Sequence, residues 1–80
     1  MAEYKYGQYL TQANNKAAYD QGYHPGTTTP YSGIYRCTKC GNEITSVSGY
    51  PFPPQNHHLH TPAQGPIVWQ LIVAHGWIKV

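Results

Sequence analysis

The sequence contains few of the residues that stabilise small folds. Among its 80 residues are two cysteines, one phenylalanine and one methionine, and only 10% of the chain is charged. Two cysteines permit at most one internal disulfide, which excludes a disulfide-rich secreted scaffold. A chain of this length buries only about 60% of the surface that its unfolded form exposes. We therefore expect a further stabilising element, and the five histidines favour a structural metal.

Long apolar runs are also lacking. The longest apolar stretch covers residues 66–74, far short of the roughly 20 residues that a membrane-spanning helix needs. The first ten residues, MAEYKYGQYL, do not show the basic region and apolar core of a signal peptide. We therefore expect a cytoplasmic protein without a membrane partner, in which reduced thiols are available as metal ligands.

Charge of either sign is sparse, and the formal net charge is +2 with neutral histidines. The basic residues are Lys5, Lys16, Arg36, Lys39 and Lys79, and the acidic residues are Glu3, Asp20 and Glu43. They form no basic stripe, so charge alone does not predict a polyanionic partner.

The composition changes along the chain, although no linker divides it. Residues 1–30 are rich in Gln, Asn, Thr, Gly and Tyr and have no sustained apolar period, which predicts a loop-rich segment. One short helix fits there, with Asn14 or Asn15 as its N-cap, Lys16 to Tyr19 inside it and Gly22 as its terminator. Residues 31–80 are expected to form a zinc-ribbon-like domain, within one domain overall.

Three segments of this second part have the composition of β-strands. Residues 33–36 and 43–47 are β-prone and flank a short tip, which predicts a hairpin. Residues 67–73 are apolar on both faces, which indicates a well-covered strand. The expected fold is therefore small and mainly β, with an antiparallel sheet of about three strands.

The predicted hairpin tip carries a pair of cysteines with metal-ligand spacing. Two side chains three residues apart on a tight turn can converge on one zinc ion, and Cys37 and Cys40 have this spacing. Gly41 follows directly and can adopt the positive φ that closes such a turn. The neighbouring Arg36 and Lys39 favour the thiolate form that binds metal.

A histidine-rich tract supplies candidates for a second ligand pair. His57 and His60 repeat the spacing of the cysteines, so the pattern is C-x2-C-x16-H-x2-H. His58 with His60 is an alternative pair, and a single histidine with water in the fourth position is another. We therefore predict a Zn²⁺ site from Cys37, Cys40, His57 and His60, with His58 as a competitor.

The stretch from Ser32 to Gly41, followed by a hairpin and the sequence Phe52-Pro53-Pro54, resembles bacterial zinc-ribbon proteins in which a second cysteine pair follows the prolines. That pair is missing here. The resemblance implies that Gln55 takes the place of the third cysteine and His58 that of the fourth. From about Tyr23 onward the chain also resembles small proteobacterial proteins of the protein L family, through the segments PYSGIYRC and PPQNHH. This second resemblance supports a metal site and implies no particular activity.

Each of these residue groups also fits a role without metal. The cysteines could be redox thiols and the histidines an exposed polar tract, while His24 and His75 fit ordinary surface positions. The tyrosines divide into expected core residues, Tyr31 and Tyr35 together with Trp69, and expected exposed residues, Tyr4, Tyr6 and Tyr9.

The sequence favours a binding protein over an enzyme. Its few acidic residues do not supply a paired base and orienting group, and a chain this short has little material for a pocket. We expect a structural zinc site in a protein-interaction module whose partner is a protein. The alternative is a nucleic-acid-binding ribbon in which Arg36, Lys39 and Lys79 contact phosphates and exposed tyrosines stack on bases.

Overall fold

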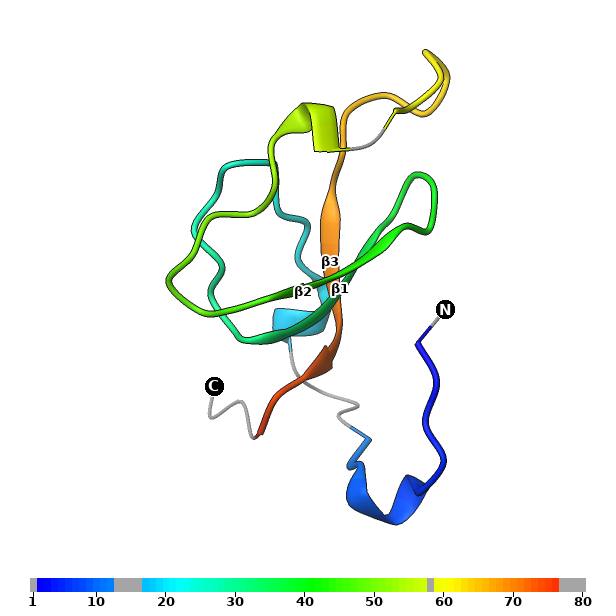
Figure 1. Cartoon of the computed structure of the whole chain (residues 1–80), viewed down its shortest axis with the longest axis vertical. Coiled ribbons are helices and arrows are strands. Elements are labelled where there is room, and N and C mark those ends of the chain that lie inside the picture. Colours follow the sequence, from blue (N-terminus) through cyan, green and yellow to red (C-terminus); the bar gives the residue numbers. More distant parts are fainter. Residues whose placement is uncertain (1, 13–16, 58, 77–80) are drawn as a thin grey trace.

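The computed structural model describes residues 2–12, 17–57 and 59–76 (Figure 1). Three strands, β1 (Gly33–Cys37), β2 (Glu43–Ser46) and β3 (Trp69–Ala74), form one antiparallel sheet in the order β2-β1-β3. The remaining regular elements of the described residues are single 3₁₀ turns: η1 (Gly7–Tyr9), η2 (Ala17–Asp20) and η3 (Gln55–His57). The predicted mainly-β fold with three antiparallel strands is confirmed.

The boundaries of two predicted elements differ from those expected. The third strand begins at Trp69 rather than at residue 67. β1 ends at Cys37, so the residue opposite Val68 is Thr38, which already belongs to the hairpin turn. The Thr38 N–H donates a hydrogen bond to the Val68 carbonyl (2.9 Å). The short helix near Tyr19 is a single 3₁₀ turn, η2. Its predicted capping residues, Asn14 and Asn15, lie outside the described residues. The division of the chain at residue 30 stays a prediction.

The core lies against the sheet, and its three largest side chains are aromatic. Its buried members are Ala18, Tyr35, Cys37, Phe52, Ile67, Trp69 and Leu71. The Tyr35 ring meets Phe52 edge to face, with 4.8 Å between the ring centroids. This arrangement confirms the predicted burial of Tyr35 and Trp69, while Tyr31 is half-buried against the cluster.

The buried Tyr35 hydroxyl is satisfied by the backbone. It donates a hydrogen bond to the Tyr31 carbonyl at 2.6 Å. Burial raises the pKa of Tyr35 to about 12, because the phenolate would lose its hydration inside the core. The ring therefore stays neutral and supplies apolar surface to a core that has few aliphatic residues.

An isolated antiparallel bridge between Thr28 and Pro51 lies outside the three strands. The Thr29 N–H donates to the Tyr50 carbonyl (2.8 Å), and the Phe52 N–H donates to the Thr27 carbonyl (2.9 Å). The hydroxyls of Thr29 and Ser46, both buried, are 2.5 Å apart and share a hydrogen bond. These contacts tie the loop before β1 to the segment after β2. No helix among the described residues is long and apolar enough to cross a membrane.

Candidate metal centre

The tip of the β1–β2 hairpin is a tight turn that carries both cysteines. Cys37 ends β1, and its N–H donates to the Asn42 carbonyl at 2.7 Å. The Gly41 N–H donates to the Cys37 carbonyl at 2.8 Å, which closes a turn around Cys40. Gly41 has a φ of 81°, and a Cβ there would lie 2.9 Å from Arg36 Nη2. The predicted requirement for a positive φ at this position is therefore confirmed.

The two cysteines differ in their surroundings. Cys37 faces the core and has no exposed surface, whereas Cys40 is exposed. Cys37 pairs with Trp69 across the β1–β3 ladder, and the adjoining Thr38 N–H is bonded to Val68. The hairpin tip is therefore fixed to the segment that leads into β3, and one cysteine lies in the core while the other faces solvent.

His60 brings an imidazole to the two sulfurs. Its Nε2 atom lies 3.4 Å from Cys37 Sγ and 3.3 Å from Cys40 Sγ. Its Nδ1 atom lies 2.7 Å from the Gly65 carbonyl, which accepts a hydrogen bond when Nδ1 carries the proton. That bond favours the tautomer in which the lone pair of Nε2 faces both sulfurs, as in many metal-bound histidines.

These distances suit a metal ion. The ligand atoms of Cys37, Cys40 and His60 all lie within 4.8 Å of one another. Two ligands of a tetrahedral zinc ion, one sulfur and one nitrogen, are about 3.6 Å apart, given Zn–S near 2.3 Å and Zn–N near 2.0–2.1 Å. The three side chains therefore lie close enough to bind one metal ion together.

A small turn after His60 positions the carbonyl that orients its ring. The Thr61 N–H donates to Gln64 Oε1 (2.7 Å), and the Gln64 N–H donates to the Thr61 carbonyl (3.0 Å). Gly65 follows with a φ of 73° and offers its carbonyl to His60. The roles of Gln64 and Gly65 were not predicted from the sequence. The signal that could have shown the turn is the run Thr-Pro-Ala-Gln-Gly, which has turn-forming residues at both ends.

His57, the other described histidine of this tract, is not part of the group. It is exposed, and its ring meets that of Trp69 edge to face at 5.7 Å. His58 lies outside the described residues. Which of the two histidines completes the site therefore stays a prediction. His24 and His75 are both exposed, which confirms the surface positions predicted for them.

Gln55 stands where the resemblance to zinc ribbons places a third cysteine. Its Oε1 atom accepts a hydrogen bond from the Ile67 N–H at 3.1 Å. Ile67 is fully buried and precedes β3. The Gln55 side chain therefore joins the histidine tract to the start of β3 and is engaged in a structural contact.

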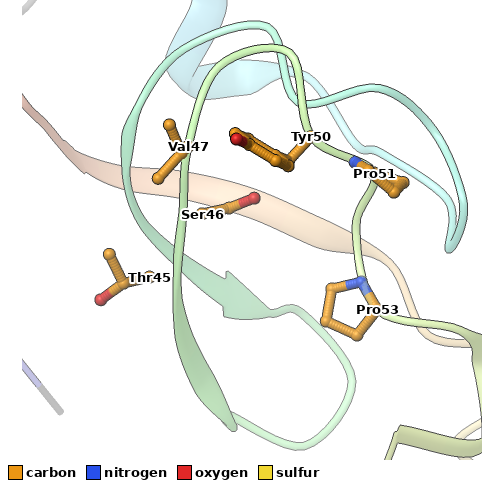
Figure 2. A pocket seen from close by; sticks show the side chains of 6 residues that line it. All are labelled: Thr45, Ser46, Val47, Tyr50, Pro51 and Pro53. Atoms are coloured by element: carbon orange, nitrogen blue, oxygen red, sulfur yellow. The ribbon is translucent and has the colours of Figure 1, made fainter.

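An open depression lies beside β2 and the segment that follows it (Figure 2). Its lining consists of Thr45, Ser46, Val47, Tyr50, Pro51 and Pro53. None of these six residues is a histidine, a cysteine or an acid, so this lining offers neither a metal site nor a pair of groups for acid–base chemistry. The chemistry of the described residues is concentrated at the hairpin tip instead.

The chain is similar to protein L of Escherichia coli, with 65% identity over 51 residues. The matched residues are 64% of this chain and 58% of that protein, so the chain spans less than two thirds of its relative. This finding confirms the resemblance to protein L that the segments around the cysteines and histidines suggested. No family model matches the chain. No solved structure matches it either.

Proposed function

We propose that this chain is a zinc protein whose metal site is structural and is built from Cys37, Cys40 and His60 with one further histidine. The observation that carries the proposal is the convergence of His60 Nε2 on the two sulfurs, at 3.3 and 3.4 Å. Two thiolates and an imidazole form a donor set that suits zinc far better than calcium or magnesium, which prefer oxygen. The reduced thiols that the site needs agree with a cytoplasmic location.

His58 is our choice for the fourth ligand. His57, the other candidate, has its ring against Trp69 and is not among the converging residues. The zinc-ribbon resemblance also supports His58 as the fourth ligand. A Cys₂His₂ set has four protein ligands, which is typical of structural zinc and leaves no coordination position for a substrate.

The position of the site in the fold supports a structural role. His60 and Gly65 lie in the segment between η3 and β3, and the cysteines lie on the hairpin between β1 and β2 (Figure 1). A metal held by both parts would link the hairpin to the segment that leads into β3. Zinc binding contributes about 10–16 kcal/mol to the folding of zinc-finger peptides, which would dominate the stability of so small a core.

The exposed aromatic residues near the N-terminus support a protein-binding role. The large exposed hydrophobic residues of this segment (residues 2–12) are Tyr4 (73%), Tyr9 (80%), Tyr6 and Leu10. Tyr6 and Tyr9 pack edge to face at 6.0 Å, and Lys5 Nζ lies 5.3 Å from the Tyr6 centroid. Tyrosine is enriched in protein interfaces because its ring provides contact area while its hydroxyl remains hydrogen-bonded. We therefore propose that this segment meets a protein partner.

Metal dependence of folding tests the structural role. The zinc-loaded chain and the same chain treated with a chelator are melted while circular dichroism and tryptophan fluorescence are followed. The proposal predicts a cooperative melt with zinc and the loss of that transition without it, restored by one equivalent of Zn²⁺. A metal-free chain that melts cooperatively at the same temperature would contradict a structural metal.

A nucleic-acid titration separates the proposal from its rival. Single-stranded and duplex DNA are titrated at low and at physiological salt, because binding through phosphates weakens steeply with salt. We expect no binding even at low salt. Salt-sensitive binding that is reduced by Lys39→Ala would favour the nucleic-acid-binding ribbon instead.

A further inference from the structure

The two cysteines of the site differ sharply in their access to solvent. Cys37 has no exposed surface and packs in the core beside Trp69. Cys40 follows three residues later at the turn and is exposed. Both sulfurs nevertheless face the same imidazole nitrogen of His60, at 3.4 and 3.3 Å. A reagent from solution can therefore reach one sulfur far more readily than the other.

We propose that Cys40 is a modification site, where the metal centre reacts first with hydroperoxides and soft electrophiles. When a hydroperoxide has oxidised Cys40, the Cys37 thiolate attacks the Cys40 sulfur and forms a disulfide. The inference rests on the proposed zinc site, because metal binding keeps both sulfurs in the nucleophilic thiolate form. Exposure then decides which of the two reacts first.

The turn holds the two sulfurs close enough to form a bond. The hydrogen bond from the Gly41 N–H to the Cys37 carbonyl closes the chain around residues 38–40. Residues three apart in such a turn have Cα atoms within about 7 Å, and disulfides form between Cα atoms about 4.4–6.8 Å apart. The ligand atoms of the site lie within 4.8 Å of one another. A disulfide between Cys37 and Cys40 therefore needs only a local movement of the tip.

The reaction balances without a further reactant. The Cys40 thiolate attacks the terminal oxygen of a hydroperoxide and the O–O bond breaks, which gives a Cys40 sulfenic acid and an alkoxide or hydroxide. That anion takes up a proton from solvent and leaves as an alcohol or water. The Cys37 thiolate then attacks the Cys40 sulfur, the S–O bond breaks, and hydroxide leaves and is protonated to water. The thiolates lose two electrons, which reduce the peroxide. A disulfide is a poor zinc ligand, so the metal is released.

The sequence makes the order of attack measurable. Arg36 precedes Cys37, and Lys39 lies between the cysteines, so trypsin places the two sulfurs on different peptides. The zinc-loaded intact chain is treated with less than one equivalent of N-ethylmaleimide, digested and analysed by mass spectrometry. We expect at least about 10-fold more adduct on Cys40 than on Cys37, and nearly equal labelling in the denatured, zinc-free chain, where burial no longer protects Cys37.

Hydrogen peroxide tests the second step on the same preparation. A chromogenic chelator follows the released zinc, while mass spectrometry detects the disulfide as a link between the two tryptic peptides. We expect one disulfide for each zinc released, and recovery of the zinc complex after reduction and addition of Zn²⁺. Equal or preferred labelling of Cys37, or zinc release without the disulfide, would overturn this inference and leave the zinc site intact. An untreated protein that binds no zinc would overturn the proposed function and this inference with it.

Discussion

The two halves of the candidate metal centre are held by different kinds of contact. The cysteine half is shaped by backbone hydrogen bonds, such as those from Cys37 to Asn42 and from Thr38 to Val68. The histidine half relies more on side chains: Gln55 Oε1 accepts from the Ile67 N–H, and Gln64 Oε1 accepts from the Thr61 N–H, beside one backbone bond from the Gln64 N–H to the Thr61 carbonyl. Formation of the sheet therefore positions the two cysteines, whereas side-chain hydrogen bonds are needed to position the segment that carries His60.

This difference suggests how the centre forms. Strand pairing between β1 and β2 brings Cys37 and Cys40 together as the hairpin closes. The histidine half must then be ordered against the hairpin, which costs about 1–2 kcal/mol for each residue whose backbone is fixed. A metal ion held by both halves would supply that free energy. Substitutions in the two halves should consequently have different effects.

The largest effect is expected from Cys37→Ser. Serine is a poor zinc ligand, and its hydroxyl would be buried in the core at a position with no exposed surface. We expect the variant to lose its zinc and, with it, its cooperative unfolding transition, because zinc supplies most of the stability of so small a core. Zinc content and urea unfolding measure this.

Cys40→Ser is the matched control for Cys37→Ser. It also loses zinc, but it places its hydroxyl at an exposed position, so it should keep more residual β structure by circular dichroism than Cys37→Ser. Retention of one zinc per chain in Cys37→Ser would show that the buried sulfur is not a ligand.

The next largest effect is expected from His60→Ala. It removes the imidazole nitrogen that faces both sulfurs and the ring bound to Gly65. Loss of a direct ligand should reduce zinc affinity by more than the roughly 10- to 100-fold that loss of an orienting partner costs. Competition with a chromogenic chelator measures the affinity.

His57→Ala and His58→Ala are the matched controls for His60→Ala. We expect His58→Ala to weaken zinc binding as well. His57→Ala should keep the zinc affinity while it loses the ring contact with Trp69, worth about 0.5–1.5 kcal/mol of stability. The reverse result for these two variants would identify His57 as the fourth ligand.

A smaller effect is expected from Gln64→Ala, which removes the acceptor for the Thr61 N–H and loosens the turn that presents the Gly65 carbonyl to His60. Zinc affinity should fall by about 10-fold, at the lower end of the range for partners that orient a ligand. Gln8→Ala changes an exposed glutamine of the N-terminal segment and should leave the affinity unchanged. Equal affinities for the two variants would show that the turn does not position His60.

The smallest effect on the metal centre is expected from a substitution in the sheet, Tyr35→Phe. Tyr35→Phe keeps the buried ring and removes its hydrogen bond to the Tyr31 carbonyl. The free energy of unfolding of the zinc-loaded protein should fall by about 0.5–1.5 kcal/mol, while zinc affinity stays the same. A change in zinc affinity as large as that of Gln64→Ala would show that the core and the metal centre are not separable in this way.

The contrast between the two halves also explains what could be predicted from the sequence. The cysteine half depends on short-range signals, namely two β-prone runs around a tip with Gly41 at its end, and the structure agrees with them. The equal spacing of His57 and His60 is a weaker signal, because two histidines three residues apart converge on one point only when both lie in the same tight turn. η3 ends at His57, and His60 is oriented by the turn that follows it. That arrangement depends on Gln64 and Gly65, whose contacts no spacing rule reveals.

X-ray absorption at the zinc edge of the purified protein decides whether the three converging side chains hold a metal. We expect one zinc per chain, with two sulfur neighbours at about 2.3 Å and two nitrogen neighbours at about 2.0–2.1 Å. A protein purified without chelators that contains no zinc, or a zinc shell without sulfur, would contradict the proposed metal centre.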